Sequence, residues 1–211
     1  MGDLPTVFIL AGGLGTRLQG ILKDCPKSLA NVGEVPFLDL QLRWLAKQGF
    51  RDVILLTGYM ADKIKIFIGE GTSWDLNIRM IQEQKPLGTG GAILHALKTI
   101  KFKQEFILLN GDSITVVSLK KFYEKKCDHL AQIVAVYQDD VSRFGTVEFD
   151  ENKCLTGFHE KSLNHQSGWI NAGIYYFPEG WFDKRIFSKF PMSLERDMFP
   201  EWISKKSCIS V

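Results

Sequence analysis

The sequence predicts an α/β protein with a doubly wound, mostly parallel sheet. Two observations support this prediction. Short apolar runs, which suit strands buried on both faces, alternate with segments of helical spacing through the first two-thirds of the 211 residues. The last third instead has two short segments around a turn-rich triplet, which predicts a hairpin added to that sheet.

The expected strands of the parallel part are short and mostly apolar. They lie at residues 6–10, 52–57, 77–82 and 105–110. Between them, apolar residues recur near helical spacing, and the glycines at positions 49 and 69 suit helix ends. These helices are expected at residues 37–49, 61–68 and 90–97.

In the last third, segments 145–149 and 153–157 flank the triplet Asp150-Glu151-Asn152, so a hairpin is expected there. Another apolar strand is expected at residues 170–177, and a short helix at 193–199 that ends before Pro200. Because the sequence contains no internal repeat and no linker, we expect one domain over residues 1–211.

The composition, 45% hydrophobic and 24% charged, is that of an ordinary soluble globular protein. A net charge of +2 gives no sign of the clustered cations that nucleic-acid binding needs. The first apolar run is too short for a signal peptide or a membrane span. We therefore expect a cytoplasmic protein that binds neither nucleic acid nor membrane. The four cysteines lack metal-ligand spacing and are expected to be reduced thiols: Cys25, Cys127, Cys154 and Cys208.

A glycine-rich segment follows the first expected strand and reads Leu10-Ala11-Gly12-Gly13-Leu14-Gly15-Thr16-Arg17. Three glycines in four positions let the backbone fold tightly and present bare N–H groups, which form an anion site. Arg17 and Lys27 add positive charge, because a guanidinium matches phosphate oxygens in pairs and an ammonium acts as a point charge. The segment therefore predicts a polyphosphate cradle.

Two better-known phosphate motifs do not fit this segment. A P-loop needs Gly-Lys followed by Ser or Thr, whereas this loop ends Gly15-Thr16-Arg17. A dinucleotide fingerprint needs a third glycine where Leu18 stands. The remaining alternative is a plain glycine turn with a solvated arginine. The closely spaced cations and the matching segments downstream argue against it.

The stretch from Leu10 to Leu18, followed by Pro26-Lys27, resembles the signature of the sugar-nucleotidyltransferases, L-A-G-G-x-G-[ST]-R-[LM] and then P-K. The resemblance implies a Rossmann-like nucleotidyltransferase fold with a C-terminal sugar-binding β elaboration. Members join a nucleoside triphosphate to a sugar 1-phosphate and release pyrophosphate. Segments 23–27, 35–39 and 88–92 look most like the bacterial branch that uses GTP and D-glycero-α-D-manno-heptose 1-phosphate.

By this resemblance, residues 1–115 are expected to be mainly nucleotide-binding and residues 116–211 mainly sugar-phosphate-binding. The implied nucleotide-binding residues are Leu10, Ala11, Gly12, Gly13, Gly15, Thr16, Arg17, Lys27, Glu83, Pro86, Gly88 and Thr89.

Glu83 lies where uridylyl- and thymidylyltransferases of the family typically have a glutamine. A carboxylate only accepts hydrogen bonds, and guanine offers two adjacent donors, so Glu83 suits guanine and repels uracil carbonyls. The alternative is a loop carboxylate that faces water.

Asp112 follows an expected buried strand and a glycine, and the resemblance makes it the aspartate that binds Mg²⁺ beside the phosphate oxygens. On the dipeptide alone, a helix N-cap or a turn would be the favoured explanation. The family usually pairs this aspartate with a second one in an x-D-[IV]-G segment, and none occurs before Val211.

The sugar side is expected from segments around Arg143-Phe144-Gly145, Phe158 to Lys161 and Asn171-Ala172-Gly173, with Glu195 in addition. The resemblance implies that Glu160 accepts from sugar hydroxyls, Lys161 holds the sugar phosphate and Asn171 contacts the ring. Gly145 and Gly173 allow close backbone approach.

The expected reaction is in-line attack by the sugar phosphate on the α-phosphorus of GTP. Arg17, Lys27, Asp112 and Lys161 are the expected catalytic residues, and they act by position and charge. Two alternatives stay open. One is another hexose 1-phosphate, such as mannose 1-phosphate, with GTP or UTP. The other is a non-catalytic nucleotide-sugar-binding subunit. A homo-oligomer is possible on this sequence.

Overall fold

The computed structural model describes residues 4–13, 15, 24–159, 166–183 and 190–211. Within these residues one sheet runs in the order β11-β7-β10-β6-β1-β4-β5. The parallel part consists of β1 (Thr6–Leu10), β4 (Asp52–Thr57), β5 (Asn77–Gln82) and β6 (Phe106–Asn110). β1 is its centre, because it pairs in parallel with both β4 and β6. The predicted parallel strands are confirmed.

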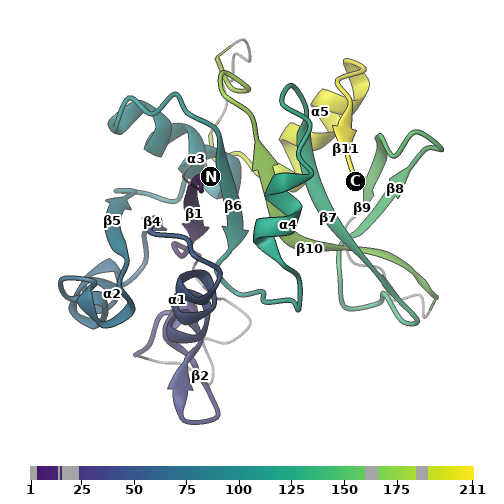
Figure 1. Ribbon diagram of the computed structural model, residues 1–211. Coiled ribbons are helices and arrows are strands. Elements are labelled where there is room, and N and C mark those ends of the chain that lie inside the picture. The colour runs from purple at the N-terminus through teal and green to yellow at the C-terminus, as the bar shows by residue number, and fades with distance from the viewer. Residues whose placement is uncertain (1–3, 14, 16–23, 160–165, 184–189) are drawn as a thin grey trace.

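The antiparallel part begins where β10 (Gly168–Phe177) pairs with β6. β10 also pairs with β7 (Ala131–Gln138), and β11 (Ile209–Ser210) joins β7 in parallel. The predicted hairpin is formed by β8 (Thr146–Phe149) and β9 (Leu155–His159), and it lies at the far side of the sheet from α2 (Figure 1). A short separate hairpin, β2 (Asn31–Val32) and β3 (Val35–Pro36), precedes the first helix.

Helices cover both faces of the sheet because alternate strand residues point to opposite sides. Val7 and Ile9 of β1 pack with α1 (Phe37–Lys47), α2 (Ala61–Ile68) and α4 (Leu119–Glu124). Phe8 packs on the other side with α3 (Gly88–Thr99) and α5 (Phe199–Ser204). Short turns of helix lie at η1 (Lys27–Leu29), η2 (Thr72–Trp74) and the π-helical η3 (Leu194–Met198). The predicted doubly wound α/β fold is confirmed.

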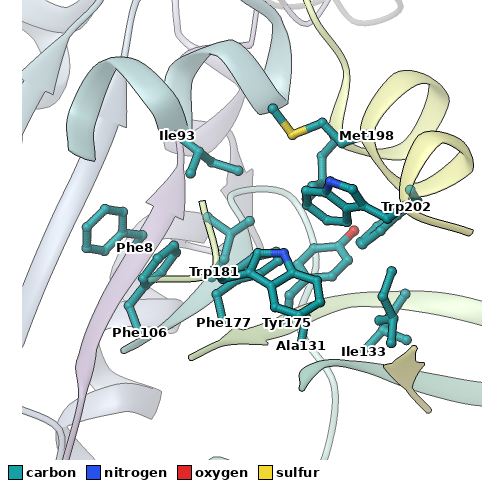
Figure 2. Close-up of a cluster of buried hydrophobic side chains, with 14 of the residues drawn as sticks. Phe8, Ile93, Phe106, Ala131, Ile133, Tyr175, Phe177, Trp181, Met198 and Trp202 are labelled. Atoms are coloured by element: carbon teal, nitrogen blue, oxygen red, sulfur yellow. The ribbon is translucent and has the colours of Figure 1, made fainter. Parts of the chain in front are cut away.

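The buried cluster on the face of the sheet covered by α3 and α5 is rich in aromatic rings (Figure 2). Phe106 stacks on Phe8 with ring centroids 4.5 Å apart, and it lies 5.3 Å from the ring of Phe177. Trp202 of α5 packs edge-on against Trp181 at 5.6 Å. This cluster fixes the C-terminal segment to the parallel sheet.

Two predictions about the last third are wrong. The helix does not end before Pro200: η3 is followed directly by α5, where Pro200 occupies the first turn. A first-turn proline is tolerated there, because its missing N–H has no partner to lose. Cys154 and Cys208 are not reduced thiols but form a disulfide across 54 positions. The fold brings them together, since Val211 N donates to Lys153 O at 2.8 Å.

The other two cysteines, Cys25 and Cys127, carry free thiols as predicted. In the described part of the chain, no helix is both long and apolar enough to cross a bilayer.

Phe106→Ala should lower the free energy of unfolding by about 3–5 kcal/mol, because a large ring leaves a closely packed site. Phe106 is 2% exposed, whereas Ile66 on α2 is 81% exposed and provides the matched control. Ile66→Ala should change the free energy by no more than about 0.5 kcal/mol. Urea unfolding followed by circular dichroism measures both. Equal losses would contradict the packing assigned to Phe106.

Candidate active site

A cavity of about 620 Å³ opens beyond the carboxyl ends of β1, β4 and β6. This is the edge at which open parallel sheets bind their ligands. The structure brings many of the predicted residues to its wall: Leu10, Ala11, Gly12, Gly13, Gly15, Lys27, Glu83, Pro86, Gly88, Thr89, Asp112 and Glu195. A second hollow, of about 510 Å³, lies at the opposite edge near Thr6, Asp52 and Asn77 and is lined by none of the predicted residues.

The glycine loop leaves β1 and lies against the end of β4, where Ala11 N donates to Leu56 O at 2.8 Å. A Cβ on Gly12 would come within 3.1 Å of the backbone of Thr57 and Gly58, so glycine permits this approach. Gly15 has φ +58, which favours glycine. Among the described residues, no atom lies within 4 Å of the position that a Cβ on Gly13 would occupy. Thr16 and Arg17 lie outside the described residues.

Asp112 is held beside this loop by a close backbone contact. Gly111 N donates to Leu10 O at 3.1 Å, and a Cβ on Gly111 would come within 2.2 Å of that oxygen. Only glycine fits at that distance. Asp112 therefore projects into the cavity, where its carboxylate pairs with the ammonium of Lys27 and accepts from Ser113 Oγ at 3.1 Å.

The Lys27–Asp112 pair is solvated, since the two side chains are 39% and 43% exposed. Exposed ion pairs contribute little to stability, so stabilisation of the fold does not account for this pair. Among the described residues no group of three or more His, Cys, Asp or Glu side chains could hold a metal ion. A single carboxylate in a cavity fits an ion whose remaining ligands are phosphate oxygens and water.

Glu83 stands at the other side of the cavity and accepts a hydrogen bond from Leu87 N at 3.0 Å. Its side chain occupies space left by two glycines: a Cβ on Gly58 would come within 2.7 Å of Glu83 Oε1, and one on Gly12 within 3.4 Å. Burial raises the pKa of the Glu83 carboxyl, while the Leu87 N–H and the charge of His95 act in the opposite direction. The carboxylate is thus partly desolvated, and it has lone pairs that the Leu87 N–H does not occupy.

The start of α3 is closed by the C-terminal segment. Gly90 N and Gly91 N both donate to Met192 O, at 3.0 and 3.2 Å, and Met192 N donates to Leu87 O at 2.8 Å. Gly88 has φ +77, and a Cβ there would come within 2.3 Å of Met192 O. The glycines of this loop therefore serve close chain packing, and these two helix amides are not open to a phosphate.

Thr89 and Glu195 join the nucleotide side to the sugar side. Thr89 Oγ1 donates to Glu195 Oε2 at 2.9 Å and accepts from Leu194 N at 2.7 Å. The hydroxyl of fully buried Tyr175 donates to Glu195 Oε1 at 3.3 Å. Burial, together with the charge of Glu195, raises the pKa of Tyr175 well above its ordinary value, so the phenol stays protonated.

Asn171 and Gly173 lie behind this wall and do not line the cavity. Asn171 Nδ2 donates to the Tyr175 hydroxyl at 2.6 Å, and Asn171 Oδ1 accepts from Gly173 N at 2.9 Å. Gly145 O accepts from Asn171 N at 3.0 Å. Asn171 is thus bonded directly to Gly145 and is connected to Glu195 through Tyr175. The predicted residues Glu160 and Lys161 lie outside the described residues.

Sequence reasoning missed several residues of the cavity wall: Ser28, Leu56, Ala92, Asn110, Gly111 and Arg196. Ser28 follows Lys27 directly, and Asn110-Gly111 precede Asp112, so the neighbouring motifs were a signal for three of them. Arg196 follows Glu195 on the π-helical turn η3. Turns of this kind occur often at functional sites. Gly58, which makes room for Glu83, had no such signal.

The fold and the site define an α/β protein that places a glycine loop, the Lys27 ammonium and three carboxylates in one cavity at the carboxyl edge of its sheet. The chain belongs to the nucleotidyl transferase family, which matches residues 6–206.

Relatives cover most of the chain. It is 38% identical over 201 residues to the D-glycero-alpha-D-manno-heptose 1-phosphate guanylyltransferase of Campylobacter jejuni, covering 94% of this chain and 84% of that protein. It is 33% identical over 202 residues to the protein of the same name from Aneurinibacillus thermoaerophilus, covering 94% and 86%. It is 35% identical over 205 residues to the mannose-1-phosphate guanylyltransferase catalytic subunit beta of Drosophila melanogaster, covering 95% of this chain and 55% of that protein.

Crystal structures of HddC from Yersinia pseudotuberculosis have the same fold. One matches with a TM-score of 0.86 and 34% identity, covering 98% of this chain and 89% of that one. The other, complexed with GMP-PN, matches with a TM-score of 0.82 and 36% identity, covering 94% and 86%.

Glu83→Gln should raise the melting temperature of the ligand-free protein at neutral pH. The pKa of Glu83 is raised in the folded state, so the folded protein holds that proton more tightly than the unfolded chain. The stability given by a neutral Glu83 is lost as the pH rises from the ordinary glutamate value through the raised one. The advantage of the variant should therefore shrink as the pH falls. Thermal melts across pH test this, and a constant difference would contradict the raised pKa.

Proposed function

We propose that this chain transfers GMP from GTP to a sugar 1-phosphate, giving a GDP-sugar and pyrophosphate. The single observation that carries the proposal is the cavity in which the Lys27–Asp112 pair stands beside the glycine loop and Glu83 stands opposite. The names of the two heptose relatives support D-glycero-α-D-manno-heptose 1-phosphate as the acceptor. Mannose 1-phosphate is the second candidate, supported by the Drosophila relative.

The reaction needs no protein nucleophile, because the ionised sugar phosphate attacks the α-phosphorus itself. A new P–O bond forms to that oxygen while the bond to the bridging oxygen of the leaving pyrophosphate breaks. Lys27 neutralises the reacting α-phosphate, Arg17 the leaving phosphates and Lys161 the sugar phosphate. Mg²⁺, when bound to Asp112 and phosphate oxygens, supplies further charge neutralisation. The protein thus contributes position and charge.

The ion pair between Lys27 and Asp112 bears on how Lys27 reaches a phosphate. While the pair is formed, the ammonium is engaged by Asp112. Lys27 becomes available to a phosphate once Asp112 has another positive partner. The exposed pair costs little to separate.

Base choice rests on Glu83. Its carboxylate accepts from Leu87 N and has lone pairs left for the adjacent N1–H and N2–H donors of guanine. A pyrimidine carbonyl at the same place would face a partly desolvated carboxylate, which is unfavourable.

The sugar side uses residues from both halves of the chain. Glu195 accepts from sugar hydroxyls, and Asn171 supports it through Tyr175. By the family resemblance Glu160 completes the sugar side, while Gly145 and Gly173 support Asn171 from behind the wall. The division at residue 115 into nucleotide-binding and sugar-binding parts stays a prediction, as does a homo-oligomer. We propose the cytoplasm as the location, where GTP is supplied.

The purified chain should release pyrophosphate from GTP and Mg²⁺ with D-glycero-α-D-manno-heptose 1-phosphate, and more slowly with mannose 1-phosphate. Lys27→Ala should reduce turnover by about 10²-fold or more, because a charge next to the reacting phosphate is lost. Its melting temperature should stay unchanged, and Lys47→Ala, an exposed substitution at the end of α1, is the control. GTP binding without turnover for any acceptor would instead support a non-catalytic subunit, and the absence of GTP binding would remove the proposal.

Glu83→Gln should lower the preference for GTP over UTP by about tenfold or more in kcat/KM. The reason is that an amide presents one donor where guanine needs two acceptors. Competition assays with both nucleotides measure the ratio. Gln84→Ala, at the exposed next position, should leave the ratio unchanged. An unaltered ratio in Glu83→Gln would show that another group reads the base.

A further inference from the structure

Gln41 of α1 is a fully buried polar residue away from the cavity wall. It is 0% exposed, and its Nε2 donates to two backbone carbonyls, Asn110 O and Ser113 O, each at 2.9 Å. These carbonyls stand on either side of Gly111 and Asp112. One side-chain amide therefore closes the turn that carries Asp112.

The turn has little else to close it. Its own hydrogen bond, from Ser113 N to Asn110 O, is 3.5 Å long. Hydrogen bonds of that length are weak. The amide of Gln41 supplies two shorter bonds to the same stretch, so it fixes the distance between residues 110 and 113 more firmly than the backbone does.

Burial of this amide is not explained by stability alone. In the part of the chain that the structure describes, Gln41 Oε1 is buried without a hydrogen-bond partner. A buried polar atom without a partner costs free energy, so a glutamine here offsets part of what its two bonds contribute. The gain that remains is geometric, because the two bonds hold one turn in one shape.

The helix that carries Gln41 also supports Lys27. Phe37 N, at the start of α1, donates to Ala30 O at 2.9 Å, directly after the short turn η1 that contains Lys27. Helix α1 is thus hydrogen-bonded to both segments that carry the Lys27–Asp112 pair.

We propose that Gln41 is a positioning residue that holds Asp112 in the place where it takes its metal and releases Lys27. This inference rests on the proposed function, in which Asp112 binds Mg²⁺. Without the two bonds from Gln41, the turn would sample other shapes and Asp112 would spend less time at the metal position. Partners that orient metal ligands typically contribute about 10- to 100-fold in metal affinity or activity.

The glutamine that caps the end of the same helix offers a control. Gln48 lies two helical turns beyond Gln41, and its Oε1 accepts from Leu119 N at 2.7 Å. This bond holds the start of α4, beyond the turn at Asp112. The Nε2 atom of Gln48 is also buried without a hydrogen-bond partner among the described residues. Gln48→Met therefore removes the same kind of bond without touching the turn at Asp112.

Gln41→Met should raise the Mg²⁺ concentration for half-maximal rate by about 10-fold or more. Titration calorimetry supplies a readout apart from activity. Affinity for GTP without metal should match that of the unsubstituted protein, whereas the gain in affinity on adding Mg²⁺ should be largely lost. Gln48→Met should lower the melting temperature and leave both metal readouts unchanged. A metal dependence of Gln41→Met equal to that of Gln48→Met would overturn the proposal.

Two further variants separate this inference from the proposed role of Asp112. In an Asp112→Asn background, Gln41→Met should cause no additional loss of Mg²⁺-dependent GTP affinity, because the two residues act in one unit. An undiminished loss in that background would show that Gln41 does not act through Asp112. If Asp112→Asn alone kept the full Mg²⁺ dependence, the metal role of Asp112 would fail first.

Discussion

The close approach of Gly111 to Leu10 is the contact on which the candidate site depends. Strands β1 and β6 run in parallel, so both end at the same edge of the sheet, and the Gly111 N–H to Leu10 carbonyl bond of 3.1 Å joins their ends. A side chain at position 111 would collide with that carbonyl at 2.2 Å. Because the contact is made, a carboxylate and an ammonium 85 positions apart meet in one cavity. The glycine loop, Lys27 and Asp112 are separate features of the sequence, and this backbone contact makes them one site.

Much of the parallel sheet could be predicted from the sequence, because each strand of that part is a short apolar run whose signal is local. One helix start was misplaced: α3 begins at Gly88 rather than at residue 90, since the chain there is shaped by Met192, which lies more than 100 positions later. The same reason explains the missed disulfide. Cys154 and Cys208 are brought together by strand pairing at the C-terminal end, and no spacing rule contains that pairing. The glycine loop and Asp112 were found because a short motif carries them, whereas Gln41 and Gly58 act through contacts that no motif records.

The C-terminal segment is a wall of the nucleotide site as well as part of the sugar side. Met192 accepts hydrogen bonds from the first amides of α3, and Thr89 is bonded to Leu194 and Glu195, so the loop that follows Glu83 is hydrogen-bonded to η3 and the residues before it. Chain packing thus explains the glycines at positions 88 and 90. Met192 O occupies the space that a side chain at position 88 would need, and the Met198 side chain occupies that space at position 90. The aromatic core around Trp202 anchors this wall to the sheet (Figure 2). On the proposed function, base and sugar are therefore bound by surfaces that these hydrogen bonds join.

The charges of the cavity wall then bear on how substrates bind. Lys27 and Asp112 neutralise each other, and because both are about two-fifths exposed their attraction is weak. On the proposed function, a nucleotide without metal attracts Lys27 but leaves Asp112 as an unpaired negative charge near its phosphates. A metal ion without nucleotide satisfies Asp112 but leaves the ammonium beside a second cation. Only the metal–nucleotide complex gives each member of the pair a partner of opposite charge. One weak pair is then replaced by two stronger ones, which favours joint binding of metal and nucleotide. The turn held by Gln41 matters to this exchange because Asp112 must keep its place while its partner changes.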